Sequence, residues 1–438
     1  MTLALALVLA CAQAAEVPDL RTRKAGSDWP SFLGPNRDGV SPEKGILTAW
    51  PAAGPRIVWE RELGTSFGAP SIARGRLFVF DRAGDRMRLS CLRSETGEEL
   101  WKAEYATDYS DRYSDNDGPR CCPVVDGDLV FTFDPAGQLH CRRVADGSLV
   151  WSADTSKNFG VVRNFFGVGS TPLVEGELLI VHVGGSPPGS PGIESGETRG
   201  NGSGIVAFEK RTGKVRWKAS DELASYSSPV AATLDGRRWG FVFARGGLVG
   251  FDPASGKIEF QHPWRAAMIE SVNVSNPVIV GDRVFVTEAY TIGGCLLKVR
   301  PGGCEVVWED GRKRERAMSS WWSTPIHADG HLYGASGMQA ADLRCIELAT
   351  GKVKWAQRGV GICSLLLADG HFVSLSDDGT LRLLKVNPDR YEERAKSELK
   401  SGGGGPLLRA PARAAPVLSH GLLYVRGSDR LACLELVP

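Results

Sequence analysis

Apolar and polar residues alternate over short stretches of this chain, and glycine-containing turns separate the stretches. Gly127-Asp-Leu-Val-Phe-Thr-Phe133, for example, is followed closely by Gln138-Leu-His-Cys141. Alternation with a period of two, interrupted by such turns, is typical of short antiparallel strands. The pattern therefore predicts an all-β protein.

A phrase of the form Thr-Gly-x-x-x-Trp recurs along the chain. Its copies, some of them weakened, end at Trp101, Trp151, Trp217, Phe260, Trp308 and Trp355. Each copy closes a longer unit that begins with a proline, and these prolines are Pro70, Pro123, Pro172, Pro229, Pro277, Pro325 and Pro416. The prolines follow one another at about 50 residues, and Leu365-Leu366-Leu367 fills the one doubled interval. The chain thus contains eight units.

Each unit has the pattern of one propeller blade. Four short antiparallel strands in about 40 to 50 residues are typical of such a blade. The Thr-Gly pair suits the tight turn between the third and fourth strands, where glycine accepts a positive φ. Large flat rings are expected to pack each blade against its neighbour, and the tryptophans in this docking position are Trp59, Trp101, Trp151, Trp217, Trp308 and Trp355.

The last unit has only three strands, and Ile57-Val-Trp59 is expected to supply the fourth. We therefore predict an eight-bladed β-propeller of four-stranded antiparallel blades, closed where this N-terminal strand joins the C-terminal blade. Seven blades are the alternative, because the seventh unit is poorly marked. Residues 56–438 would form this single domain, after a lead-in at residues 16–55 that is expected to be mobile over residues 16–30.

The first residues resemble an export signal. Residues 2–10 are apolar but too few to span a bilayer, and Ala12-Gln-Ala14 resembles a signal-peptidase site, although the usual positive charges are missing. We predict a signal peptide at residues 1–15 and an exported protein of the periplasm or cell envelope. Val8-Leu-Ala-Cys11 also loosely matches a lipoprotein processing site, and Cys11 would then carry a lipid anchor.

The charge balance removes two classes of partner. With 52 basic and 51 acidic residues, the chain has no net field to attract nucleic acid or an anionic membrane. The basic run Arg312-Lys-Arg-Glu-Arg316 is interpreted as a solvated loop. We expect a monomer with no nucleic-acid partner, no metal site and no transmembrane span.

Four of the ten cysteines occupy the same place in the repeat, the third strand of a unit, and these are Cys91, Cys141, Cys345 and Cys433. Copies of one position in separate blades lie too far apart for a disulfide, so we expect small core residues. Cys295 is expected on the same face, and Cys304 in a turn.

Cys121 and Cys122 are adjacent. A bond between them would need a distorted backbone and would be easily reduced. Two unpaired residues leading into Pro123 are the other interpretation.

The Thr-Gly-x-x-x-Trp phrases resemble the tryptophan-docking repeats of the pyrroloquinoline quinone (PQQ) quinoprotein superfamily, which includes quinoprotein alcohol dehydrogenases and BamB-like assembly lipoproteins. Asp28-Trp-Pro-Ser-Phe-Leu-Gly-Pro-Asn-Arg-Asp-Gly39 resembles the leader of exported bacterial PQQ-like repeat proteins, many from planctomycete-type genomes. The likeness covers residues 28–437. It implies the propeller fold but little about function, because docking residues hold blades together and touch no substrate.

Recognition in a propeller is expected on the face that carries the loops between blades, which we call the loop face. Candidate side chains in those loops are Tyr109, Arg112, Tyr113, Arg163, Asn164, Tyr226, Arg265, Glu270, Trp321 and Trp322. An insertion at residues 184–204 begins with Ser186-Pro-Pro-Gly-Ser-Pro-Gly192 and suits a semi-rigid lid or a partner-binding loop. The alternative is that these residues only satisfy the loop backbone and fill the axial channel.

The resemblance also implies a cofactor site to be tested. Its dehydrogenases clamp PQQ between a vicinal disulfide and a tryptophan, with a calcium ion held by a carboxylate and an amide. The counterparts here would be Cys121 and Cys122, Glu197 (or Glu194) and Asn273. The haem-attachment motif is absent, as are the common hydrolase, zinc-protease and phosphate-loop motifs.

We therefore predict an exported, non-catalytic propeller that binds or scaffolds at the cell envelope, and the BamB resemblance implies a protein partner. No cofactor is expected for that function. One alternative is a PQQ- and calcium-dependent dehydrogenase of alcohols or sugars. Another is a carbohydrate-binding propeller in which Tyr109, Tyr113, Trp321 and Trp322 stack against sugar rings.

Overall fold

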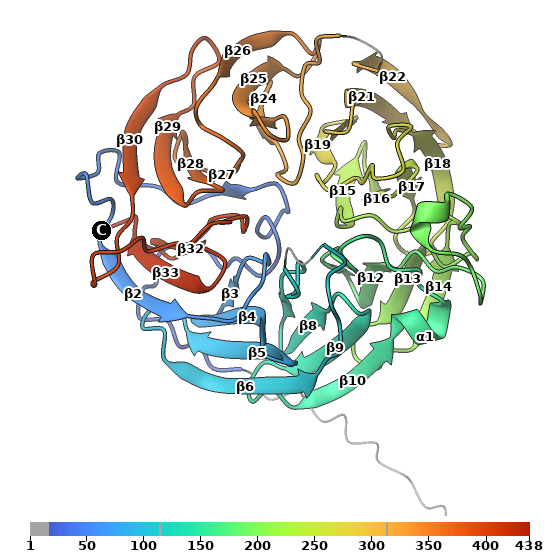
Figure 1. The fold of residues 1–438 in the computed structure, drawn as a ribbon, viewed down its shortest axis with the longest axis horizontal. Coiled ribbons are helices and arrows are strands. Elements are labelled where there is room, and N and C mark those ends of the chain that lie inside the picture. Colours follow the sequence, from blue (N-terminus) through green and yellow to red (C-terminus); the bar gives the residue numbers. More distant parts are fainter. Residues whose placement is uncertain (1–16, 114–115, 312–313) are drawn as a thin grey trace, which may run out of the picture.

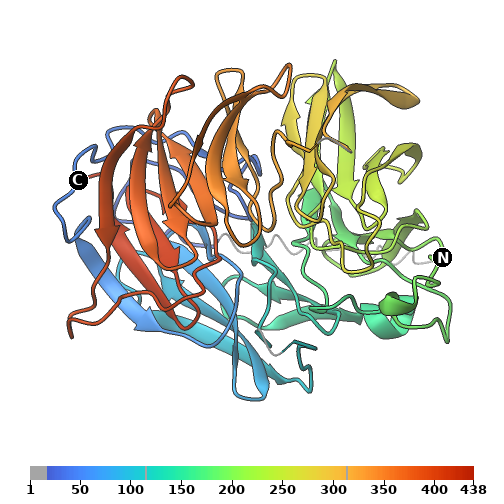
Figure 2. The ribbon, with the colours of Figure 1, turned by 45° about the horizontal axis from the view of Figure 1, so that its top comes forward.

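The computed structural model describes residues 17–113, 116–311 and 314–438. Eight four-stranded antiparallel units stand around a common axis (Figure 1). The same ring turned by 45° shows neighbouring blades standing side by side (Figure 2). The prediction of eight blades is confirmed, and the seven-bladed alternative is wrong. The signal peptide predicted at residues 1–15, with Cys11, lies outside the described residues, as do Arg312 and Lys313 of the basic run.

The first four blades are formed by β3 (Ser71–Ala73), β4 (Arg76–Ala83), β5 (Arg86–Arg93) and β6 (Glu99–Ala106); β7 (Val124–Asp126), β8 (Leu129–Phe133), β9 (Gln138–Arg143) and β10 (Leu149–Asp154); β11 (Leu173–Glu175), β12 (Leu178–His182), β13 (Ile205–Glu209) and β14 (Val215–Ala219); and β15 (Val230–Leu234), β16 (Arg237–Phe243), β17 (Gly247–Phe251) and β18 (Ile258–Pro263). The first strand of each blade lies nearest the axis. Two short helices, α1 (Thr155–Phe159) and a 3₁₀ turn (Ile193–Ser195), interrupt this pattern.

The remaining blades are formed by β19 (Val278–Val280), β20 (Arg283–Glu288), β21 (Gly293–Arg300) and β22 (Gly303–Glu309); β23 (Ile326–Ala328), β24 (His331–Ser336), β25 (Asp342–Glu347) and β26 (Val353–Gln357); β27 (Cys363–Ala368), β28 (His371–Ser376), β29 (Thr380–Lys385) and β30 (Glu393–Glu398); and β31 (Val417–Ser419), β32 (Leu422–Arg426) and β33 (Arg430–Glu435). The outer strand of the eighth blade is β2 (Ile57–Glu62), which pairs antiparallel with β33 and brings Trp59 opposite Cys433. The predicted ring closure is therefore confirmed. Among the described residues, no helix is long and apolar enough to cross a bilayer.

The ring of each docking tryptophan packs against a turn of the next blade. Gly147, in the turn between β9 and β10, has a φ of 74°, and a Cβ atom there would lie 2.6 Å from the Trp101 ring. The indole Nε1 of Trp101 donates to the Val144 carbonyl oxygen at 3.0 Å. Two separate constraints thus require glycine at this position: the backbone has a positive φ, and the indole ring occupies the space of a side chain. The ring of Trp217 lies against Gly256 in the same way.

The recurrent cysteines follow this register. Cys91 lies opposite Trp101 and is fully buried, and Cys141, Cys345 and Cys433 repeat its place. The expectation that Cys295 shares their face is wrong. In the fifth blade Leu296 lies opposite Trp308, because the hairpin is longer there, so Cys295 faces the preceding blade instead. Cys304 lies in β22 rather than in a turn.

The expectation of a mobile lead-in is also wrong for the described residues from Val17 onward. Trp29 is 1% exposed and pairs with Ile72 of β3 through two backbone hydrogen bonds. The leader crosses the face opposite the loop face, since it meets the turns between first and second strands, including Arg74. It then forms β1 (Val40–Ser41), which adds to β27 in parallel near the ring axis.

Arg37 anchors the leader inside the ring. Its guanidinium donates to the carbonyl oxygens of Pro172 (2.6 Å) and Pro229 (3.3 Å), at the starts of the third and fourth blades. Burial lowers the pKa of Arg37 to about 10. In Figure 1 the N-terminal segment, in blue, reaches the middle of the ring. The axial channel is therefore filled from the face opposite the loop face.

A pair of substitutions tests how much the indole hydrogen bond of a docking tryptophan contributes to stability. The Nε1 of Trp217 is buried and, within the described chain, has no acceptor, whereas that of Trp101 does. Both Trp→Phe changes remove similar volume, but Trp101→Phe also leaves the Val144 carbonyl without its donor. We expect Trp101→Phe to lower the free energy of unfolding by about 1 to 3 kcal/mol more than Trp217→Phe. Urea-unfolding midpoints measure the difference, and equal losses would contradict it.

Candidate functional site

An axial cavity of about 150 Å³ lies where the eight blades meet. Every blade contributes to its wall, and Phe32 and Leu33 of the leader close it from the opposite face. The residue three positions before each starting proline lines the cavity, and these residues are Phe67, Arg120, Gly169, Tyr226, Val274, Trp322 and Arg413. The geometry follows from the repeat, because each chain segment approaches the axis at the same point before it enters its inner strand.

Aromatic side chains make up a third of the residues in the wall. The rings that line it belong to Phe32, Phe67, Phe166, Tyr226, Tyr290, Trp321 and Trp322. Hydrogen bonds fix several of these rings: the hydroxyl of Tyr226 accepts from the Phe166 backbone N–H at 2.7 Å, and the indole N–H of Trp321 donates to the Tyr290 hydroxyl at 3.3 Å. Burial raises the pKa of Tyr226, which keeps its hydroxyl neutral. The cavity therefore offers flat, fixed apolar surfaces.

Two arginines complete the wall, and both are ion-paired. Arg120 donates to the buried carboxylate of Asp111 at 2.9 Å and lies 5.1 Å from the centre of the Phe166 ring. Arg413 pairs with Asp377 at 3.3 Å and lies over Phe67 at 5.0 Å. Such stacked guanidinium groups extend the aromatic surface. Among the described residues, no carboxylate itself lines the cavity.

Two hydrogen-bond donors in the wall lack a partner. The indole Nε1 of Trp322 and the hydroxyl of Ser323 are buried and, in the part of the chain that the structure describes, make no hydrogen bond. Unpaired buried donors are costly, but neither atom has accessible surface, so a bound group would reach them only if the wall moved. The open part of the cavity can thus hold a flat apolar group.

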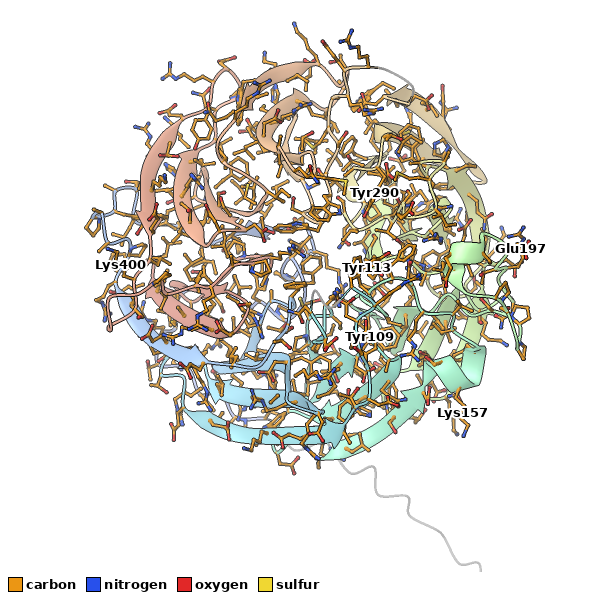
Figure 3. All side chains as sticks on the ribbon, viewed as in Figure 1. Tyr109, Tyr113, Lys157, Glu197, Tyr290 and Lys400 are labelled. Atoms are coloured by element: carbon orange, nitrogen blue, oxygen red, sulfur yellow. The ribbon has the colours of Figure 1, made fainter. Side chains whose placement is uncertain are left out.

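The predicted loop-face residues divide into two groups. Tyr226, Trp321 and Trp322 line the cavity. Tyr113 lies at its mouth, 54% exposed and with its ring 5.4 Å from that of Phe166. In Figure 3 both Tyr113 and Tyr290 are found near the middle of the ring. Tyr226, Trp321 and Trp322 therefore lie together at the axis, and Tyr113 lies close to them through Phe166.

The remaining candidates lie elsewhere. Tyr109 is 3% exposed beneath the guanidinium of Arg163, and burial raises its pKa to about 12. Arg112 pairs with Glu194 of the insertion at 3.4 Å, so its side chain contacts that loop and does not line the cavity. Glu270 is exposed.

Asn164 and Arg265 belong to the loops around Arg245. The side-chain oxygen of Asn164 accepts from the Arg245 guanidinium at 3.3 Å, and Arg265 donates to backbone carbonyls of its own loop. Neither side chain is among those that line the axial cavity.

The residues proposed for PQQ and calcium are not brought together. Cys122 lines the cavity, and both it and Cys121 are buried free thiols. Glu197 is exposed at the outer edge of the ring (Figure 3). The Asn273 amide is buried and donates to the Ala244 carbonyl oxygen at 2.7 Å.

The cavity chemistry does not fit the calcium of a quinoprotein site. Calcium takes six to eight oxygen ligands, usually with carboxylates among them. The cavity wall has two arginines and, within the described ranges, no carboxylate. No cluster of three or more metal-ligating side chains occurs in the described residues.

Sequence reasoning missed several cavity residues, including Phe32, Phe67, Arg120, Tyr290 and Arg413. A usable signal was present for three of them, because Phe67, Arg120 and Arg413 share the position three before a starting proline. For Phe32 no such signal existed, since the leader lies outside the repeat.

The family model described as outer membrane protein assembly factor BamB matches residues 85–357, which is more than half of the chain. The chain belongs to this family. A search of curated proteins with this sequence found no match.

Solved structures share the fold of this BamB-family chain. BamB from Moraxella catarrhalis superposes with a TM-score of 0.58 at 13% identity, over 87% of this chain and 97% of that one. A quinohemoprotein alcohol dehydrogenase from Pseudomonas putida gives 0.53 at 14%, over 93% and 80%. The computationally designed protein Ika8 gives 0.52 at 10%, over 91% and 99%. At such low identity these likenesses show the shared fold only.

The state of the vicinal cysteines gives a prediction. Burial raises the pKa of the Cys122 thiol to about 12 and that of the Cys121 thiol as well. At pH 8 only about 1 in 10,000 of the Cys122 thiols would be ionised, so iodoacetamide should label neither cysteine in the folded protein. Both should label after unfolding without a reductant, as read by mass spectrometry of the peptide. The half-buried Cys304 is the internal comparison. A peptide that stays unlabelled until reduced would reveal a bond and contradict the prediction.

Proposed function

We propose that this BamB-family protein is an exported, non-catalytic propeller of the cell envelope that binds a segment of a protein partner on its loop face. One aromatic or large aliphatic side chain of the partner would enter the axial cavity. The observation that carries the proposal is the cavity itself: about 150 Å³, walled by seven aromatic side chains, and closed from behind by the leader.

The size of the cavity supports an anchored side chain. An apolar cavity of about 150 Å³ is known to hold a benzene-sized group. Buried aromatic anchors in such pockets commonly dominate the affinity of protein interfaces. Export is supported by the apolar stretch at residues 2–10 and by the family description.

The dehydrogenase alternative has the support of the fold, which a quinohemoprotein alcohol dehydrogenase shares. It requires hard oxygen ligands beside the cofactor. The described wall supplies aromatic rings, hydroxyls and ion-paired arginines in their place. No catalytic step is therefore assigned.

Carbohydrate binding is a second candidate because of one observation. Tyr113, Tyr290 and Trp321 gather at the mouth of the cavity, with Tyr290 hydrogen-bonded to Trp321. Aromatic faces of this kind also stack against sugar rings. Titration with peptides and with oligosaccharides therefore distinguishes the two candidate functions.

Peptide selection tests the proposed function. A phage-displayed library of random 12-residue peptides is selected on the mature protein, and calorimetry measures the selected peptides. We expect them to share one aromatic or large aliphatic residue. We expect Trp321→Ala to weaken their binding by at least about tenfold, or about 1.4 kcal/mol, through loss of the cavity wall.

The control is Val215→Ala, an exposed position on β14, which should leave binding unchanged. Cello- and xylo-oligosaccharides and PQQ with calcium are titrated in parallel. Peptides without an apolar anchor, or equal binding by both variants, would overturn the proposal. Saturable oligosaccharide binding lost in Trp321→Ala would favour the carbohydrate candidate, and saturable PQQ binding would favour the dehydrogenase.

A further inference from the structure

A second cleft, of about 510 Å³, lies on the loop face beneath the insertion at residues 184–204. Thr198 and Arg199 of the insertion form one wall, and Arg245 and Arg265 from the loops of the fourth blade form the other. The insertion is well fastened there, since the Asn201 amide donates to the carbonyl oxygens of Phe159 and Ser186 at 2.9 and 2.8 Å. The cleft is thus a built feature.

The cleft is distinct from the axial cavity but adjoins it. One apolar cluster separates the two, formed by Phe165, Ile193, Tyr226 and Val272. Ile193 faces the cleft, whereas Tyr226 and Val272 line the axial cavity. The two sites therefore share a wall without sharing polar groups.

Arg245 is a buried cation with only neutral partners. It is 5% exposed, and its guanidinium donates to the carbonyl oxygens of Ile269 (2.6 Å) and Ser271 (3.4 Å) and to the side-chain oxygen of Asn164 (3.3 Å). Among the described residues, no carboxylate lies within ion-pairing distance of it. Because burial opposes the charge, the pKa of Arg245 is lowered to about 10.

Arg265 lies beside it and is also without an ionic partner in the described chain. It donates to the same Ile269 carbonyl oxygen at 3.0 Å and to that of Met268 at 3.2 Å. Its Nε is buried and makes no hydrogen bond with any described residue. Two guanidinium groups therefore converge on one oxygen atom, and one of them has a spare donor.

The carboxylates of the cleft are directed elsewhere. Asp221 accepts from the Gly202 backbone N–H at 2.7 Å, and Glu222 accepts from that of Gly246 at 2.8 Å. Glu288, the other acid near Arg265, accepts from the Ser271 hydroxyl at 2.7 Å. Neither guanidinium is thus ion-paired with a described carboxylate, although the charges of Glu222 and Glu288 favour the charged form of Arg265. Arg245 is therefore a buried cation beside a second, half-buried one, which is a costly arrangement.

We propose that this cleft binds an oxyanion, a carboxylate or phosphate group carried by a small molecule, between Arg245 and Arg265. Guanidinium groups present planar donor pairs that match both kinds of oxyanion, and charge-assisted hydrogen bonds of this type are strong. The bound oxygens would accept from the accessible part of the Arg265 guanidinium and offset the positive charge that it shares with Arg245. Arg199, exposed on the insertion, would add a third cation at the entrance.

The test measures how tightly the whole protein binds defined anions and how each anion changes its thermal stability. Calorimetry measures inorganic phosphate, citrate and chloride at equal ionic strength, and thermal unfolding follows in the same solutions. We expect phosphate or citrate, but not chloride, to bind saturably and to raise the Tm. Binding of phosphate alone identifies a phosphate group as the ligand chemistry, and binding of citrate alone identifies a carboxylate.

Variants locate the effect. Arg265→Gln should weaken that binding by at least about tenfold. The matched control is Arg238→Gln, which removes an arginine outside the cleft that is already paired with Glu175 at 2.7 Å. Arg265→Glu should abolish binding, because it replaces a cation of the cleft by a carboxylate that repels the anion.

Equal binding by Arg265→Gln and Arg238→Gln would overturn the proposal, as would the same Tm rise in chloride. So would an Arg265→Glu protein that still binds the anion. Should Arg265→Glu fail to fold, Arg199→Gln at the exposed entrance supplies the second variant, with an expected weakening of about threefold from loss of one exposed cation.

Discussion

The contact between a tryptophan ring and the turn glycine of the next blade is the constraint on which the ring depends. A four-stranded blade cannot bury both of its faces alone, so each must be covered by a neighbour. The ring of Trp101 lies where a side chain at Gly147 would stand, and its indole N–H is bonded to the Val144 carbonyl. Repeated around the axis, this contact sets the angle between blades and so the width of the channel that they enclose.

A ring of eight blades leaves a central channel, and the leader determines what that channel becomes. Trp29 fixes the leader to the first blade, and Arg37 reaches the carbonyl oxygens that open the third and fourth. With Phe32 and Leu33 closing one end, the channel is reduced to a shallow aromatic cavity at the other. The shape of the candidate site is therefore a product of segments that lie outside the repeat.

The fold could be predicted from the sequence because every blade solves the same packing problem with the same residues. The site could be predicted only in part. Tyr226 and Trp322 hold a fixed place in the repeat and lie at the axis, but the path of an irregular loop depends on contacts made only in the folded chain. Glu197 therefore lies at the outer edge, carried there by the insertion. The burial of the leader could not be predicted either, because Trp29 meets its partner Ile72 only in the folded protein.

The entry point of the leader orients the molecule. At Val17 the described chain lies beside Arg74, whose guanidinium donates to the Val17 carbonyl oxygen at 3.0 Å, on the face away from the aromatic cavity and the arginine cleft. The described chain therefore enters the ring on the face opposite both concave sites. A molecule bound at either site would thus leave the face crossed by the leader uncovered.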